Sequence, residues 1–62
     1  MRVYKIDNRC MLKIGDVRDS LRRRFGSKKV DQFDNYIKRK AGLMDGNSFY
    51  IFKIDYDKFI SG

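Results

Sequence analysis

The chain has 62 residues, of which 42% are apolar, 15% are aromatic and 37% are charged. This length allows one small domain over residues 1–62, and the apolar content is too high for a disordered tail. No apolar run approaches the ~20 residues that span a bilayer, and the first residues lack the apolar stretch of a signal peptide. We therefore expect a cytoplasmic protein that does not contact the membrane.

The cysteine and histidine content limits which disulfide, metal and catalytic sites the chain can form. Cys10 is the only cysteine and there is no histidine, so an internal disulfide is excluded and zinc has no ligand set. The usual general base near neutral pH is also missing, and so small a fold has little room for a pocket that excludes water. Nuclease chemistry on Arg, Lys and Tyr stays open, but we expect a non-enzymatic protein with no cofactor and no metal.

The charge is basic and unevenly distributed. Fifteen Lys and Arg residues against eight Asp residues give a net charge of +7. Eight basic and three acidic residues give residues 1–26 a net +5, five and two give residues 27–42 a net +3, and two and three give residues 43–62 a net −1. The excess indicates a polyanionic partner, most simply nucleic acid, on the first two-thirds of the chain. The alternative is that the charge serves solubility alone.

The chain begins with a short β-branched and aromatic segment. Residues 1–6 predict one strand, and residues 7–9 predict a turn. Cys10 and the apolar Met11 and Leu12 that follow are expected to lead into the core.

The next apolar residues recur at helical spacing. Ile14, Val17, Leu21 and Phe25 lie three or four residues apart, which predicts a helix with one apolar face. Three arginines at residues 22–24 fill its last turn. One interpretation is that their positive charge interacts favourably with the C-terminal end of the helix dipole. The other is that they contact phosphate.

A glycine and a serine separate this helix from another. Gly26 is the residue type that ends a helix in the left-handed region, and Ser27 is a good N-cap. The second helix is expected from about Lys28 to Lys40, closed by Gly42. Its expected buried residues are Val30, Phe33, Ile37 and Ala41. Two short helices around a tight turn are a helix-turn-helix pattern.

The other side of the second helix carries polar residues at the spacing of one stripe, namely Gln32, Asn35, Tyr36 and Arg39. Asn and Gln can pair with adenine and Arg with guanine, so this stripe is a candidate for reading bases. The alternative is an ordinary solvated face. Asp31 and Asp34 count against the first interpretation if they face the same groove.

A β-hairpin is expected over residues 43–54. Asp45-Gly46 is a strong two-residue turn signal, and both faces of the second strand are largely apolar, so that strand should be central, with the N-terminal strand as a neighbour. Residues 55–60 then predict a short closing helical turn with Tyr56, Phe59 and Ile60 turned inward.

These elements carry a resemblance to a family. Small excisionases from conjugative transposons and phages, or recombination directionality factors, have Gly-Asn-x-Ile-x-Ile, then an aromatic, an acid, a lysine and two apolar residues. At the same offsets the chain resembles them with Gly46-Asn47-x-Phe49-x-Ile51 and Tyr56-Asp57-Lys58-Phe59-Ile60. Phe25-Gly26-Ser27-Lys28-Lys29-Val30 is similar to their turn into the recognition helix, and Leu12-x-Ile14 to the pair that opens their first helix. Regulators of the mercury-resistance type share the module.

The resemblance implies an α+β fold, a small winged helix-turn-helix with an N-terminal strand, two helices, a C-terminal β-hairpin wing and a short final helical turn. It implies that the second helix enters the major groove and that the wing follows the backbone or minor groove. Together with the basic residues, the expected DNA-binding set is Arg18, Arg22, Arg23, Arg24, Lys28, Lys29, Gln32, Asn35, Tyr36, Lys38, Arg39, Asn47 and Ser48.

The leading hypothesis is a DNA-binding accessory protein of a phage, plasmid or mobile element. Excisionase-like proteins bind and bend duplex DNA so that an integrase can assemble, and they often regulate transcription. A protein this small needs cooperative self-association on DNA or a partner for useful specificity. Two alternatives stay open. One is a phage-encoded factor that binds a host enzyme such as RNA polymerase through the C-terminal third. The other is an RNA-binding domain that stacks bases on Tyr36 or other exposed aromatic rings.

Overall fold

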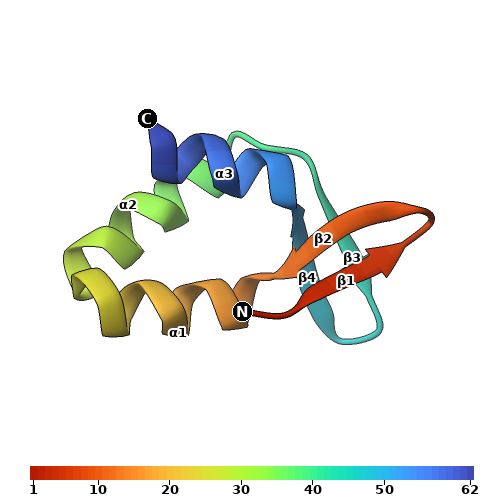
Figure 1. Cartoon of the computed structure of the whole chain (residues 1–62), viewed down its shortest axis with the longest axis horizontal. Helices are drawn as coiled ribbons and strands as arrows, with labels where there is room; N and C mark the ends of the chain where they lie inside the picture. Colours follow the sequence, from red (N-terminus) through yellow and green to blue (C-terminus); the bar gives the residue numbers. More distant parts are fainter.

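The computed structural model describes all 62 residues, in seven elements. Their order is β1 (Val3–Ile6), β2 (Arg9–Lys13), α1 (Ile14–Phe25), α2 (Ser27–Ile37), β3 (Gly42–Asp45), β4 (Ser48–Phe52) and α3 (Lys53–Ser61). The strands form one antiparallel sheet in the order β1-β2-β4-β3. The helices gather on one side, and the two hairpins extend away from them (Figure 1). The expected α+β class is confirmed.

The N-terminal segment differs from its prediction, because it is a hairpin and not a single strand. Asp7 and Asn8 both have positive φ, 53° and 64°, which is the backbone of the two-residue turn that matches the twist of paired strands. The chain therefore reverses at once, and β2 pairs with β1 on one side and with β4 on the other. We expected the N-terminal strand to lie beside the C-terminal hairpin, but β1 lies at the edge of the sheet and pairs with β2 alone. Cys10, expected in the core, is exposed on β2.

The two central helices meet at Gly26. Gly26 ends α1, as predicted, and its N–H donates to the Arg22 carbonyl at 3.0 Å. Its φ of 91° and ψ of 178° lie in an extended region open essentially to glycine, and not in the expected left-handed helical region. Ser27 is not the N-cap. It is the first residue of α2, and Gly26 occupies the cap position with no side-chain bond. Phe25, expected on the apolar face, is 49% exposed at this corner.

The second helix ends three residues earlier than expected, at Ile37. The N–H groups of Arg39 and Lys40 donate to the carbonyls of Tyr36 and Ile37, which tightens the chain into a turn. Three predictions are therefore wrong. Arg39, expected on the polar stripe of the helix, lies in the turn after it. Ala41 is exposed outside the helix, and Gly42 opens β3 and does not close α2.

The C-terminal hairpin forms, with β4 central as predicted. Its turn residues are Gly46 and Asn47, one position later than the Asp-Gly prediction, because Asp45 pairs with Ser48 and Gly46 supplies the positive φ of 63°. The closing segment is a full helix, α3, which begins at Lys53, so residues 53 and 54 are helical and not part of the second strand as expected. Tyr56 is buried and Phe59 half-buried, but Ile60 is 38% exposed, contrary to expectation.

Within α3 the Lys53 ammonium donates to the Asp57 carboxylate at 2.9 Å, which raises the pKa of Lys53.

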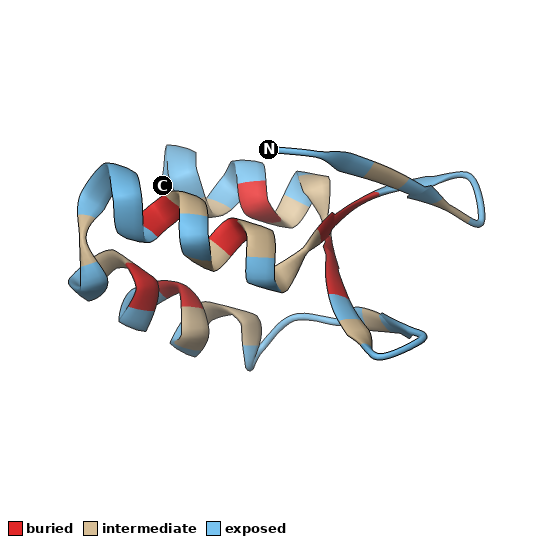
Figure 2. Ribbon diagram, turned by 90° about the horizontal axis from the view of Figure 1, so that it is seen from below, coloured by how far each residue is buried: buried red, intermediate tan, exposed pale blue.

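The core lies where the three helices meet the sheet. Its buried residues are Leu12, Val17, Leu21, Val30, Phe33, Ile51 and Tyr56. Phe33 is fully buried at the centre, and the Phe59 ring packs edge-on against it with centroids 5.4 Å apart. Burial is concentrated on the facing sides of the helices and on the central strands (Figure 2). The outer side of α2 is left free for another role.

Candidate nucleic-acid interface

Two hollows flank α2, and between them they contain most of the expected site residues. The helix–hairpin groove, of about 810 Å³, lies between α1, α2 and the β3–β4 hairpin. Its polar border consists of Lys13, Arg18, Asp34, Lys38, Asn47 and Ser48. The α2–α3 groove, of about 430 Å³, is lined by Gln32, Asn35, Tyr36, Arg39, Lys40 and Phe59. Eight of the thirteen predicted residues are thus divided between these two neighbouring grooves.

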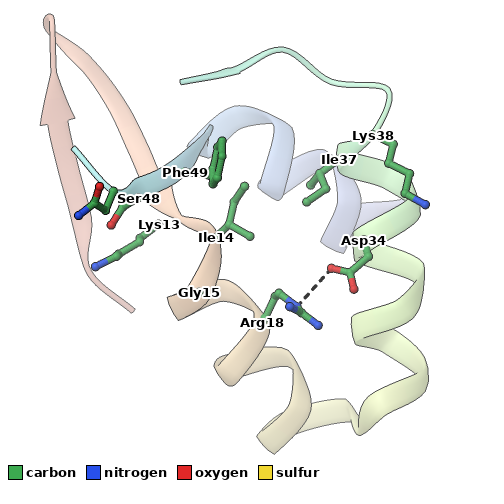
Figure 3. A pocket seen from close by; sticks show the side chains of 10 residues that line it. Lys13, Ile14, Gly15, Arg18, Asp34, Ile37, Lys38, Ser48 and Phe49 are labelled. Carbon is green, nitrogen blue, oxygen red and sulfur yellow. Dashed lines mark ion pairs between the residues drawn. The ribbon is translucent and has the colours of Figure 1, made fainter. Parts of the chain in front are cut away.

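The helix–hairpin groove is cationic on its border and apolar on its floor. Lys13 points toward the hairpin side of the groove, Lys38 lies at the end of α2, and Ile14, Ile37 and Phe49 are the apolar side chains between them (Figure 3). Residues far apart in sequence thus surround one hollow. Such a border suits a polyanion, and the apolar floor suits sugar or base edges.

Arg18 and Asp34 face each other across this groove. The Arg18 Nε and Asp34 Oδ1 atoms lie 3.3 Å apart, and the N–H lacks the alignment of a hydrogen bond. The side chains are 43% and 35% exposed, so the pair contributes at most about 1 kcal/mol to stability. The consequence is electrostatic, because Asp34 is the only acid on the border and Arg18 offsets its charge. Lys13 and Lys38 are left without an acidic partner.

The α2–α3 groove contains the predicted polar stripe. Gln32, Asn35 and Arg39 are exposed, and their side chains form no hydrogen bond or ion pair within the protein. Their donors and acceptors are therefore available to a ligand. This is the side-chain chemistry that reads adenine and guanine edges in the major groove.

Tyr36 differs from the rest of that stripe. Its hydroxyl donates to the Asp55 carbonyl at 2.7 Å, and its ring lies 5.0 Å from the Phe59 ring. The Lys40 ammonium lies 5.1 Å from the centroid of the same ring. Tyr36 therefore holds α2 against α3, and its hydroxyl is occupied within the fold.

The corner between α1 and α2 carries the remaining expected cations. Residues 22–24 are exposed in the last turn of α1, and Lys28 is exposed at the start of α2. The Arg24 guanidinium lies over the Phe25 ring, and the Lys29 ammonium lies between the Phe25 and Phe59 rings. Lys29 thus has a packing role, while Lys28 extends into solvent without a partner.

Sequence reasoning missed two cations of these grooves. Lys13 ends a strand that was not predicted, and Lys40 was expected inside a helix and not in the turn beside Tyr36. The signal for Lys13 was the Asp7-Asn8 pair. Had it been read as a hairpin turn, it would have placed residues 9–13 in a strand.

No protein-family model, curated protein or solved structure matches this chain. None of the three helices is both long enough and apolar enough to cross a membrane. No three Cys or Asp side chains come together in a cluster that would hold a metal ion. A functional assignment therefore rests on the residues and geometry of the chain itself.

Proposed function

We propose that this chain is a non-enzymatic DNA-binding accessory protein of a phage, plasmid or mobile element, with a winged helix-turn-helix as its fold. In this proposal α2 is the recognition helix and the β3–β4 hairpin is the wing. Its cellular role is that of an excisionase-like factor or a transcriptional regulator. The order of α1, α2 and the hairpin supports the proposal, as does the pairing of β2, the strand before α1, with the hairpin strand β4.

The observation that carries the proposal is the outer side of α2. Lys28, Gln32 and Asn35 are exposed on α2 and Arg39 is exposed in the turn after it, and none of the four side chains has a hydrogen-bond or ion-pair partner in the protein. A helix with a free amide pair and free cations can enter the major groove and read base edges. Asp31, also exposed on α2, restricts the fit, because it repels phosphate but can accept a hydrogen bond from cytosine.

The helix–hairpin groove supplies the second contact. When a recognition helix lies in the major groove and a wing in the adjacent minor groove, the phosphate strand between the two grooves passes between helix and wing. Lys13 and Lys38 border that path, and Ser48 lies on the hairpin side of it (Figure 3). Asn47, in the turn of the hairpin, lines the same groove. Phosphate contacts at these positions orient the protein without reading sequence.

Binding then proceeds in two stages. The +7 charge first attracts the duplex, with phosphate contacts from Lys13, Lys28, Lys38 and the arginines at 22–24, while Arg18 stays paired with Asp34. Base contacts from Gln32, Asn35 and Arg39 then set sequence preference. Because one copy covers few base pairs, specificity requires cooperative binding at repeated sites or an integrase partner. The chain needs no cofactor for this role.

Duplex binding at several salt concentrations tests the proposal. If about four phosphates are neutralised, log affinity falls with log salt at a slope near −0.9 per phosphate. Fluorescence anisotropy with a labelled duplex measures this slope, and unlabelled single-stranded RNA serves as a competitor. Absence of duplex binding at low salt, or an affinity that ignores salt, contradicts the proposal. Tighter binding of the RNA favours an RNA-binding domain, and capture of host RNA polymerase without DNA favours the host-enzyme alternative.

A further inference from the structure

Two large apolar side chains face each other across the β3–β4 hairpin. Met44 and Phe49 are cross-strand partners, one step before the pair Asp45 and Ser48 that closes the turn. Met44 is 60% exposed and Phe49 is 58% exposed, and Ile54 on α3 is the only large apolar residue that is more exposed than either. Two neighbouring exposed apolar side chains near the end of a projecting hairpin are a candidate contact surface.

The charges around this pair indicate what can cover it. Phe49 lies with Ile14 and Ile37 in the helix–hairpin groove, whose border carries Lys13 and Lys38 (Figure 3). Asp34, the one acid on that border, pairs with Arg18. Asp45 follows Met44 on the strand, so the alternation of side chains turns it to the opposite face of the sheet. The occupant must offer negative charge together with apolar edges, and a duplex does so where phosphates flank stacked bases.

We propose that Met44 and Phe49 form an apolar wedge that enters the minor groove, opens one base step and bends the duplex. This inference rests on the proposed function, because it requires the β3–β4 hairpin to contact the duplex as a wing. It adds that this contact bends the DNA. Paired strands lie about 5 Å apart, and the minor groove of B-form DNA is about 6 Å wide, so the hairpin with its side chains enters only where the groove widens. Apolar wedges between base steps bring about that widening and kink the duplex by about 20–90°.

The wedge also predicts a sequence effect at positions that form no hydrogen bond with the protein. Pyrimidine–purine steps such as TA unstack easily, whereas A-tracts are stiff. A site with a TA step under the hairpin therefore binds more tightly than the same site with an A-tract there. The preference depends on Met44 and Phe49 and is independent of α2.

Fluorescence resonance energy transfer between dyes at the two ends of a short duplex measures the bend. The wild-type chain is compared with Phe49→Ala, Met44→Ala and the double variant, each checked for folding by its thermal melt. Ile54→Ala is the matched control, because Ile54 is 62% exposed but lies outside both grooves. Phe49→Leu keeps an apolar side chain and is the rescue variant.

The expected result is a wild-type bend of at least about 20° that the double variant loses and that Ile54→Ala and Phe49→Leu retain. The salt slope stays unchanged and affinity falls by less than about tenfold, because the phosphate contacts remain. A duplex that is bound but straight overturns the wedge and leaves the proposed function intact. A bend that survives in the double variant also overturns the wedge, and the apolar pair then belongs to another partner. No binding to any duplex overturns both proposals.

Discussion

Tyr36 lines the α2–α3 groove, but its one polar atom is already used inside the fold. The hydroxyl donates to the Asp55 carbonyl at 2.7 Å, and the ring packs against Phe59. Asn35 and Arg39, its neighbours in the same groove, have no such partner. Helical spacing put these side chains on one stripe, but it did not distinguish a residue that anchors α3 from residues whose polar atoms stay free.

Tyr36→Phe separates these two roles. Losing one intramolecular hydrogen bond costs about 0.5–1.5 kcal/mol of stability, and 1 kcal/mol shifts the melting temperature of a domain this size by roughly 4–8 °C. We expect that loss of stability with unchanged duplex affinity. Asn35→Ala is the matched comparison, with stability changed by no more than about 0.5 kcal/mol and affinity reduced. Thermal melts and duplex titrations measure both. A Tyr36→Phe variant that melts like the wild type but binds DNA weakly contradicts the anchoring role.

Among the elements, the junction of α1 and α2 sets how α2, our proposed recognition helix, is presented. Gly26 has φ of 91° and ψ of 178°, a backbone region open essentially to glycine alone. No atom lies within 4 Å of a Cβ built there, so the constraint comes from the backbone and not from crowding. Gly15 in α1 also has space for a Cβ, and its φ is not positive.

Replacement by alanine should change the stability of the protein in opposite directions at these two glycines. Gly26→Ala should destabilise the protein by about 1–3 kcal/mol, because alanine must adopt a strained conformation. Gly15→Ala should stabilise it by about 0.4–1 kcal/mol, because it restricts the unfolded chain and fits the helix. Chemical denaturation of the two variants beside the wild type measures both. Equal stability changes of the same sign would contradict this geometry of the junction.

The elements themselves were predictable to different degrees. Both central helices and the C-terminal hairpin follow from apolar spacing and from the glycines at 26 and 46, because those signals lie within each segment. The pairing of β2 with β4 joins segments about 40 residues apart, and no local pattern encodes that choice. The early end of α2 is also a tertiary effect, since the chain must turn after Ile37 to start β3.

The part of the candidate site that α2 carries could be predicted from the sequence, but the part that several elements form together could not. The stripe on α2 follows from helical spacing alone, and the structure brings it to one groove. The helix–hairpin groove joins Lys13, Lys38 and Phe49 from three elements, so it depends on packing that spacing does not define. The exposure of Met44 and Phe49 could not be predicted either, because an apolar strand residue is normally expected inside.

In the molecule as a whole, the basic charge is concentrated on the part of the fold that contains α2. The net +8 of residues 1–42 lies on β1, β2, α1, α2 and the turn after α2, whereas the hairpin and α3 carry a net −1. The outer side of α2 lies in the basic part and is free of internal partners. The central claim is therefore that α2 reads bases while cations around it hold phosphates.

One comparison of variants tests that claim most directly. Selection from a random duplex library supplies a preferred site, and Asn35→Ala and Lys28→Ala are then titrated on that site and on a scrambled duplex. Asn35→Ala should lose about 1–3 kcal/mol on the preferred site only. Lys28→Ala should weaken both duplexes about equally and make the salt slope shallower by about one unit. If the two variants behave alike on both duplexes, α2 does not read bases and the account is wrong.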